Sequence, residues 1–425
     1  MLLKKSRFSF SKFIYQSLFK PWQQMDMPLF ILTVGLTIFG GLMIRSTEIN
    51  QGLYDWFWHW MTGIVGVCLA LVLARIPYHN WLQFHWATYA ITNGSLIAVK
   101  LIGSSAKGAQ RWITIFGFNV QPSEFAKIFV IITIAALLHK TTAAKIDRVF
   151  YVLAFIAVPW LLVFLQPDLA TSLVFGAIVL GMLYWANANP GWLLLLISPV
   201  IAAILDNLYK PGWIAWSIAM GIVAWFCIPW RKFGISAIGG LAINLLGGEL
   251  GAFAWNNLLR PYQKSRLTVF LNPNQDALAA GYHQAQSKIA IGSGEWWGWG
   301  LNQGPMTQLS FVPEQHTDFI FSAVGEELGF IGCLVLISAL CLVCLRLLHI
   351  AQTANDNFGS LLAVGVLSMI IFQMTINIGM TVGLAPVAGI PLPWMSYGRS
   401  AMLTNFIAVG IVESVANFRP RRKYY

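Results

Sequence analysis

A cluster of ionisable side chains stands directly before one of the long apolar segments of this chain. Glu314, His316 and Asp318 fall within five residues, and the apolar segment starts at Phe319. A carboxylate at a membrane–water boundary is partly desolvated, which raises its pKa and suits it to act as a general base. The same three groups could hold a metal, although E-x-H-x-D lacks a strong zinc spacing. Thr317 or Asp318 could instead cap a helix.

Further ionisable side chains stand inside or beside apolar segments. Glu124 and Lys127 are three residues apart, so on a helix they share a face and can pair, either for structure or to contact a substrate. Glu326 and Glu327 lie about two turns into an apolar segment, where a charge costs ~2.5 kcal/mol or more and is usually paired or functional. Asp168 opens another apolar segment, and a helix cap competes with a chemical role there.

Basic residues gather in two of the segments that connect apolar stretches. Segment 103–124 and the start of the next apolar stretch contain Lys107, Arg111 and Lys127. Segment 256–318 contains Arg260, Lys264, Arg266 and Lys288. Long loops cross membranes despite their charge, so solvated surface charge is the alternative to a binding role.

The composition of the chain indicates that the elements that position these groups are membrane helices. Of the 425 residues, 57% are hydrophobic and only 10% are charged, whereas a soluble domain carries about 25% charged residues. The apolar runs reach the roughly 17–25 residues that span a bilayer, and they lack the strict alternation of barrel strands. We therefore expect an all-α polytopic membrane protein.

Apolar windows predict twelve spans, with the segment at 192–205 short enough to be tilted, re-entrant or merged with its neighbour. The spans are 28–44, 57–73, 81–99, 125–138, 150–165, 169–185, 192–205, 213–228, 235–253, 319–345, 361–384 and 401–412. All five cysteines fall inside these spans, so packing explains them better than metal or redox chemistry.

The basic residues also orient the chain. With the N-terminus inside, 16 of the 27 Lys and Arg residues are cytoplasmic, which predicts both termini inside by the positive-inside rule. The net charge of +11 is spread over short loops, so it does not indicate a nucleic-acid surface. We expect a basic cytoplasmic leader (1–27) that contacts membrane lipid, a transmembrane domain (28–418) and a basic cytoplasmic tail (419–425).

The long segment 256–318 is predicted to be a structured outer loop. Its glycine clusters, prolines and aromatic residues differ from the composition of a disordered linker. Residues 284–291 could form a short amphipathic helix on the membrane surface. Loops of this length are usually functional.

Several strings in these segments resemble the SEDS family (shape, elongation, division and sporulation), and within it the RodA branch. The strings are K-G-A-Q-R-W at 107–112, Q-P-S-E-F-A-K at 121–127, Q-P-D-L at 166–169, G-Y-H-Q-A-Q-S-K-I-A-I-G-S-G at 281–294, P-E-Q-H-T-D-F-I-F at 313–321, G-E-E-L-G at 325–329 and P-L-P-W-M-S-Y-G-R-S at 391–400. There are three departures: twelve predicted spans where the family usually has ten, Arg399 where the family has Gly, and Gln315 where the RodA branch often has Arg.

The resemblance implies a GT-C-like fold and a peptidoglycan glycosyltransferase in the bacterial inner membrane. Such an enzyme polymerises lipid II, an undecaprenyl-diphosphate-linked disaccharide-pentapeptide, into β-1,4 glycan for cell elongation. It also implies that Asp318 is the general base and that His316 orders Asp318 or the acceptor sugar. The candidate diphosphate-binding cations are Lys107, Arg111, Lys127, Arg266 and Lys288, with Glu124 orienting Lys127. A divalent cation (Mg or Mn) between the diphosphate and Asp318 is an added expectation, although no complete ligand set is visible in the sequence.

Two other functions compete with this one. A flippase or transporter for a lipid-linked precursor would also need buried ion pairs and outward cations. A non-catalytic scaffold of the elongation complex would need only the membrane fold. The resemblance further implies a class B penicillin-binding transpeptidase and membrane proteins of the elongation complex as partners.

Overall fold

The computed structural model describes residues 22 and 24–419, with gaps at 107–108, 116–117, 167, 229–233, 258, 260 and 272–279. Within these residues the chain folds into a bundle of long helices. Eleven of the twelve predicted spans fall on one helix each, and span 81–99 begins in the short helix α4 (His79–Gln83) and continues in α5. These helices are α2 (Met27–Glu48), α3 (Asp55–Arg75), α5 (His85–Ile102), α6 (Pro122–Leu138), α7 (Ile146–Phe164), α8 (Leu169–Trp185), α9 (Pro190–Leu208), α10 (Lys210–Cys227), α11 (Ile235–Asn257), α15 (Ile320–Thr353), α16 (Asn357–Val382) and α17 (Arg399–Asn417).

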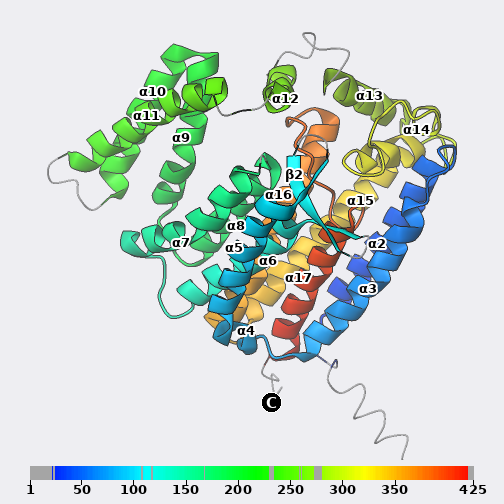
Figure 1. Ribbon diagram of the computed structural model, residues 1–425, viewed down its shortest axis with the longest axis horizontal. Helices are drawn as coiled ribbons and strands as arrows, with labels where there is room; N and C mark the ends of the chain where they lie inside the picture. Colours follow the sequence, from blue (N-terminus) through cyan, green and yellow to red (C-terminus); the bar gives the residue numbers. More distant parts are fainter. Residues whose placement is uncertain are drawn as a thin grey trace, which may run out of the picture.

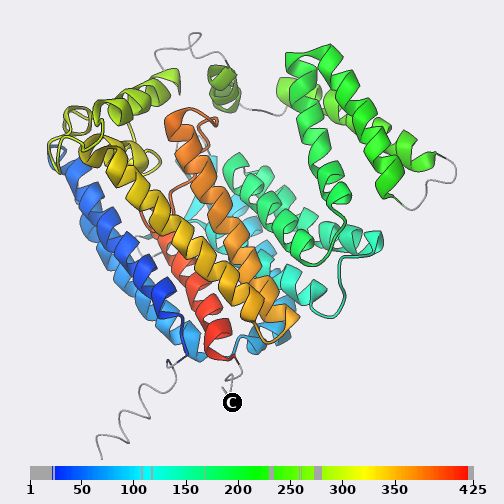
Figure 2. The same cartoon turned by 180° about the vertical axis from the view of Figure 1, so that it is seen from behind.

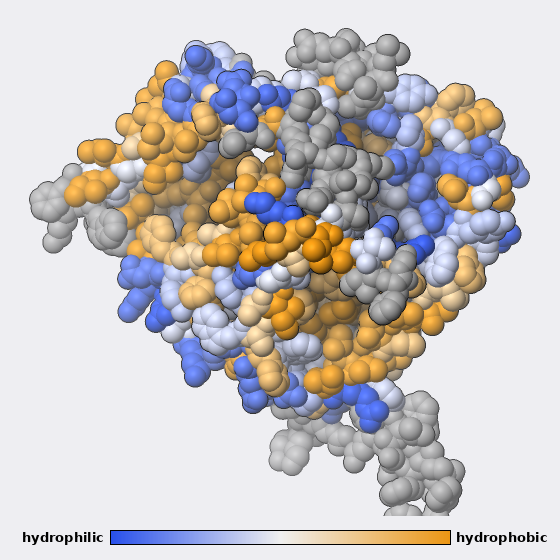
Figure 3. Space-filling view, in the orientation of Figure 1, coloured by the Kyte–Doolittle hydropathy of each residue, from blue (hydrophilic) through white to orange (hydrophobic). Residues whose placement is uncertain are grey.

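Eight of the described helices are long and apolar enough to cross a membrane. The prediction of an all-α, multi-pass membrane protein is confirmed. Segment 192–205, which could have been merged or re-entrant, belongs to a separate 19-residue helix, α9. The surface matches this class, because hydrophobic residues spread across the middle of the molecule and hydrophilic ones gather toward its two ends (Figure 3).

The start of α2 and the end of α17 meet at one end of the bundle, which we call the terminal face. There the backbone amide of Asp26, at the start of α2, donates to Glu413 near the end of α17 at 2.7 Å. Arg346 of α15 pairs with the Asp26 carboxylate from the same side. Asp356 also lies on this face, where it caps α16 and accepts from Tyr78. Because α2 begins here and α17 ends here, both described ends of the chain lie on the same face (Figure 1).

Several helices share the core, and α6 and α17 are the most completely buried of them. Nearly every residue of α6 is buried, as are most residues of α16 and α17. In contrast, α9, α10 and α11 pack mainly on one another and stand to one side of the bundle, as the reverse view shows (Figure 2). Among the described residues of these three helices, only Trp192 belongs to the buried core of the main bundle.

The end of the bundle opposite the termini, which we call the loop face, carries the irregular elements. Three short antiparallel strands connect α5 to α6: β1 (Ser104–Ala106), β2 (Ala109–Ile115) and β3 (Phe118–Val120). The sequence prediction treated this segment as a loop, so these strands were missed. The long segment 256–318 also folds on this face, into α12 (Pro261–Leu271), α13 (Ala280–Ser293) and α14 (Pro305–Gln308).

The helix predicted at 284–291 is confirmed as part of α13, but its buried face packs on protein. The side chains of Gln284 and Ser287 donate to carbonyls of Met380 and Thr381 at the end of α16, at 3.1 and 2.9 Å. These bonds satisfy carbonyls that the end of a helix leaves without partners. The contact of α13 with a membrane surface stays a prediction.

Candidate active site

A cavity of about 600 Å³ opens on the loop face, and most of the ionisable residues singled out above line it. Its wall is built by β2, β3, the starts of α6, α8 and α17, the segment before α15, and the middle of α16. The charged residues that line it are Arg111, Glu124, Lys127, Asp168, Glu314, Asp318 and Arg399. Residues that are far apart in the sequence therefore surround one polar space.

Glu124 and Lys127 form the predicted i, i+3 pair, with Lys127 Nζ 2.6 Å from Glu124 Oε2. Pro122 stands at the first turn of α6, where its missing N–H costs no hydrogen bond. The pair lies just inside this helix, and Lys127 is only 1% exposed. An ammonium group has three donors, so it can bind Glu124 and an anionic ligand together.

Asp168 is the N-cap of α8 and also ties three elements together. Its carboxylate accepts from the Thr171 backbone amide at 3.3 Å and from the Thr171 hydroxyl at 3.0 Å. Gln121 and Ser123, from the start of α6, donate to the same carboxylate at 3.2 and 3.3 Å. Arg111 of β2 approaches it at 3.8 Å. The capping interpretation is confirmed here, and it places Arg111 at the cavity.

Asp318 differs, because the capping interpretation is wrong for it. Among the described residues no side chain caps α15, and its N-cap position is Phe319. The Asp318 backbone is held from α16, where Asn377 Nδ2 donates to Asp318 O at 2.9 Å and to Ile390 O at 2.7 Å. The Asp318 carboxylate faces the cavity instead.

Arg266 of α12 reaches the same place as Asp318. A Cβ added to Gly389 would lie 3.5 Å from Arg266 Nη1 and 3.5 Å from Asp318 Oδ2, so both charged groups flank this glycine. Gly389 has a φ of +73°, a conformation that side-chain-bearing residues rarely adopt. A cation from the long loop segment thus stands beside the aspartate.

The sequence analysis missed two amides on α16. Gln373 lines the cavity and is 1% exposed, and Asn377 lies one turn further along the same face. Polar side chains four residues apart in an apolar segment were the signal that could have revealed them.

Arg399, which replaces a glycine of the SEDS pattern, opens α17 at the cavity wall. Its Nε donates to the Tyr397 hydroxyl at 3.0 Å, and its guanidinium lies over the rings of Trp58 and Phe118, at 4.6 and 5.5 Å. Such stacking fixes the side chain between α3 and β3.

Two predicted site residues lie elsewhere, and a third, Lys107, is outside the described residues. Lys288 does not line the cavity, because its ammonium end covers Gly383 at the C-terminus of α16, where a Cβ would collide with it. His316 turns away from the cavity toward Asp55, with Nε2 3.8 Å from Asp55 Oδ2.

The buried acids of α15 have structural partners. Glu326 accepts from the backbone amides of Met306 and Thr307 at 2.6 and 2.8 Å, and so binds the start of α14. Glu327 accepts from the hydroxyl of Ser46 on α2. These contacts favour the paired interpretation of both residues.

The fold and the cavity define a class: a multi-pass membrane protein with a charged cavity at one end of its helix bundle. Within this class, the chain belongs to the FtsW/RodA/SpoVE family of cell cycle proteins, whose family model matches residues 26–213 and 212–421.

Characterised relatives and solved structures agree with this family. The chain is 33% identical to the peptidoglycan glycosyltransferase RodA of Treponema pallidum, over 92% of this chain and 97% of the relative. It is 35% identical to the peptidoglycan glycosyltransferase MrdB of Escherichia coli K12, over 84% of each chain. Its fold matches a chain of a peptidoglycan synthase complex with a TM-score of 0.69 at 23% identity, covering 93% of this chain and 98% of that one. The Thermus thermophilus rod shape determining protein RodA matches with a TM-score of 0.61 at 20% identity, covering 94% and 99%.

Proposed function

We propose that this chain is a peptidoglycan glycosyltransferase that polymerises lipid II into β-1,4 glycan strands for cell elongation. One observation carries the proposal: Asp318, which caps no helix, shares a single cavity with the Glu124–Lys127 pair and Arg111. In this proposal the chain lies in the bacterial inner membrane, with the loop face outside and both termini in the cytoplasm.

The chemistry needs one base and several cations. The bond from the anomeric carbon of the donor to undecaprenyl diphosphate breaks, and this diphosphate is already a good leaving group, so no general acid is required. Asp318 would accept the proton of the acceptor sugar 4-hydroxyl while that oxygen attacks the anomeric carbon of the donor, inverting its configuration. Lys127, Arg111 and Arg266 would stabilise the negative charge that grows on the diphosphate.

The ion pairs of the cavity suit this role. Glu124 lies 2.6 Å from the buried Lys127 ammonium and compensates its charge at a depth where an unpaired charge is costly. Asp168 orients Arg111 in the same way from α8. Substrate contacts by Lys107, Lys288 and His316 stay predictions.

A divalent cation, Mg or Mn, fits the cavity only as a companion of the substrate. Two of its carboxylates are already engaged by protein groups, Glu124 by Lys127 and Asp168 by hydroxyl and amide donors. Asp318 would therefore offer one ligand, and the diphosphate and water would supply the others. When bound, the cation would neutralise charge on the leaving group.

The partner we propose is a class B penicillin-binding transpeptidase, acting with other membrane proteins of the elongation complex. The synthase complex whose chain shares this fold is described as coordinating polymerisation with crosslinking. A polymerase at the loop face would deliver its strands on the side where crosslinking takes place.

The test is glycan-chain formation from lipid II by the purified full chain with its transpeptidase partner. Asp318→Asn should abolish polymer, whereas Asp147→Asn, an exposed acid outside the cavity, should match the unsubstituted chain. Polymer from Asp318→Asn would overturn the assignment of the base. No polymer from the unsubstituted, folded chain with an active partner would favour a transporter or a scaffold.

A further inference from the structure

Beside the cavity, three potential metal ligands from three separate elements meet. Glu48 ends α2, Asp55 begins α3, and His316 belongs to the segment before α15. Each offers one ligand atom, and these atoms all lie within 4.8 Å of one another. The closest charged approach between the last two is 3.8 Å, from His316 Nε2 to Asp55 Oδ2.

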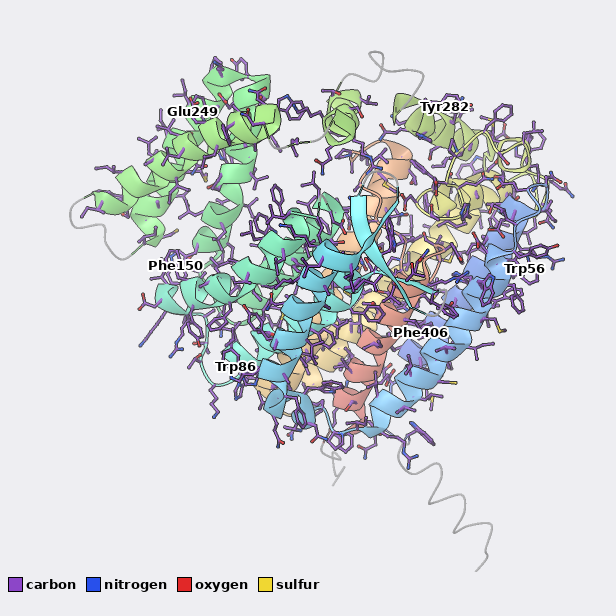
Figure 4. The ribbon with its side chains drawn as sticks, in the orientation of Figure 1. Trp56, Trp86, Phe150, Glu249, Tyr282 and Phe406 are labelled. Carbon is purple, nitrogen blue, oxygen red and sulfur yellow. The ribbon has the colours of Figure 1, made fainter. Side chains whose placement is uncertain are left out.

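Glu48 provides an independent sign that this cluster takes a ligand. The residue is 2% exposed, and its Oε2 accepts from the Trp56 backbone amide at 3.2 Å. Its other oxygen, Oε1, is buried and has no hydrogen-bond partner among the described residues. Burying a carboxylate oxygen without a partner is costly, so such an oxygen calls for a proton or a cation. Trp56, labelled in Figure 4, marks this place in the first turn of α3.

The surroundings hold the other two ligands in position. The Tyr397 backbone amide donates to His316 O at 2.9 Å, and the rings of the two residues lie 6.1 Å apart. The Tyr397 hydroxyl donates a hydrogen bond to the Asp55 carboxylate, as outer donors do at metal sites.

We propose that Glu48, Asp55 and His316 bind a divalent transition-metal ion of the Mn²⁺ or Zn²⁺ type. An imidazole nitrogen beside two carboxylates suits these ions, whereas Mg²⁺ and Ca²⁺ prefer oxygen ligands throughout. Metal–ligand bonds of about 2.0–2.2 Å require the three atoms to draw somewhat closer than they stand here. Asp55 and His316 are only partly buried, with exposed side-chain fractions of 28% and 18%, which leaves an entry path and room for water ligands.

The site is distinct from the cavity of the proposed enzyme. None of its three ligands lines that cavity, and Tyr397 and Arg399 stand between the two places. A bound ion would tie α2 and α3 to the segment that carries Asp318 two residues after His316. It would act as a positioning element, and its presence does not depend on the proposed function.

Metal binding is measured directly on the full chain in detergent after treatment with a chelator. Mn²⁺ is titrated and the free ion is followed by electron paramagnetic resonance, with Zn²⁺ measured by competition against a chromogenic chelator. We expect one tight site per chain for at least one of the two ions. Glu48→Gln keeps the acceptor for Trp56 and should weaken binding by at least about 10-fold, and Asp55→Asn should do the same.

Two controls separate this site from others. Glu295→Gln changes an exposed acid of the loop face, and Asp318→Asn changes the cavity. Both should bind the metal as the unsubstituted chain does. The proposal is overturned if the unsubstituted chain binds neither ion, if Asp318→Asn removes the binding, or if folded Glu48→Gln and Asp55→Asn bind normally. Size-exclusion chromatography establishes that each variant is folded. If Glu48→Gln does not fold, the test is made with Asp55→Asn, because Asp55 is partly exposed.

Discussion

Asp168 and Asp318 both stand at the loop-face start of an apolar helix, α8 and α15, and both line the same cavity. The Asp168 carboxylate accepts from Thr171, Gln121 and Ser123, so its oxygens serve the fold. Asp318 caps no described helix, and its backbone is held instead, because its carbonyl accepts from Asn377 and its amide donates to Glu314 O. The two aspartates therefore have different roles in the fold, although their sequence settings look alike.

Replacing each aspartate by asparagine tests this difference most strongly. Asp318→Asn removes the base and should lower the rate of lipid II polymerisation by about 10²–10⁴-fold, with the melting temperature unchanged. Asp168→Asn keeps a good capping residue, so it should retain a larger share of the activity. Rates from purified variants and their melting curves provide the comparison. Equal losses of activity in the two variants would contradict it.

The Glu124–Lys127 pair should contribute both to the stability of the protein and to its polymerisation activity. Lys127→Met leaves the buried Glu124 carboxylate without its partner and should destabilise the protein by about 3–5 kcal/mol. The double variant Lys127→Met with Glu124→Gln should recover most of that stability but not the polymerisation activity. Thermal unfolding and glycan synthesis, measured on the same preparations, separate the two effects. Full activity in the stable double variant would show that Lys127 does not contact the substrate.

Loss of the Asp168 cap of α8 should have a moderate effect on the stability of the protein. Asp168→Ala removes the acceptor for the Thr171 amide and should cost about 1 kcal/mol of stability, whereas Asp168→Asn should cost less. Asp318→Ala, at a position that caps no helix, should change stability little. Unfolding of the three variants in one detergent is the measurement, and an equal loss for Asp318→Ala would mean that its carboxylate is structural after all.

The smallest effect is expected at Lys288. Its ammonium lies at the C-terminus of α16, where a cation contributes about 0.3–1 kcal/mol. Lys288→Met should therefore lower the melting temperature slightly, and Lys288→Arg should restore it. A large rise in the lipid II concentration needed for half-maximal rate would instead establish the predicted diphosphate contact.

Some of this site was predictable because the responsible interactions are local. The Glu124–Lys127 pair needs only helical spacing, and the cap at Asp168 needs only the backbone amide of Thr171 three residues later. The capping alternative at Asp318 followed from the same local rule and was wrong, because the segment before α15 is held from α16 by Asn377. The strands β1–β3 were missed because β1 and β3 have only three residues each, too few to show an alternating pattern.

The sequence by itself determined the class of the protein, its twelve helical segments and the residues capable of acid–base chemistry. Length, apolar content and residue type suffice for these, since each helix satisfies its own backbone hydrogen bonds in a membrane. Only the tertiary structure decided which charged groups meet: Arg266 beside Asp318, Arg399 between Trp58 and Phe118, and Glu48 with Asp55 and His316. Those contacts join residues far apart in the chain, so they depend on how the helices pack and not on any local pattern.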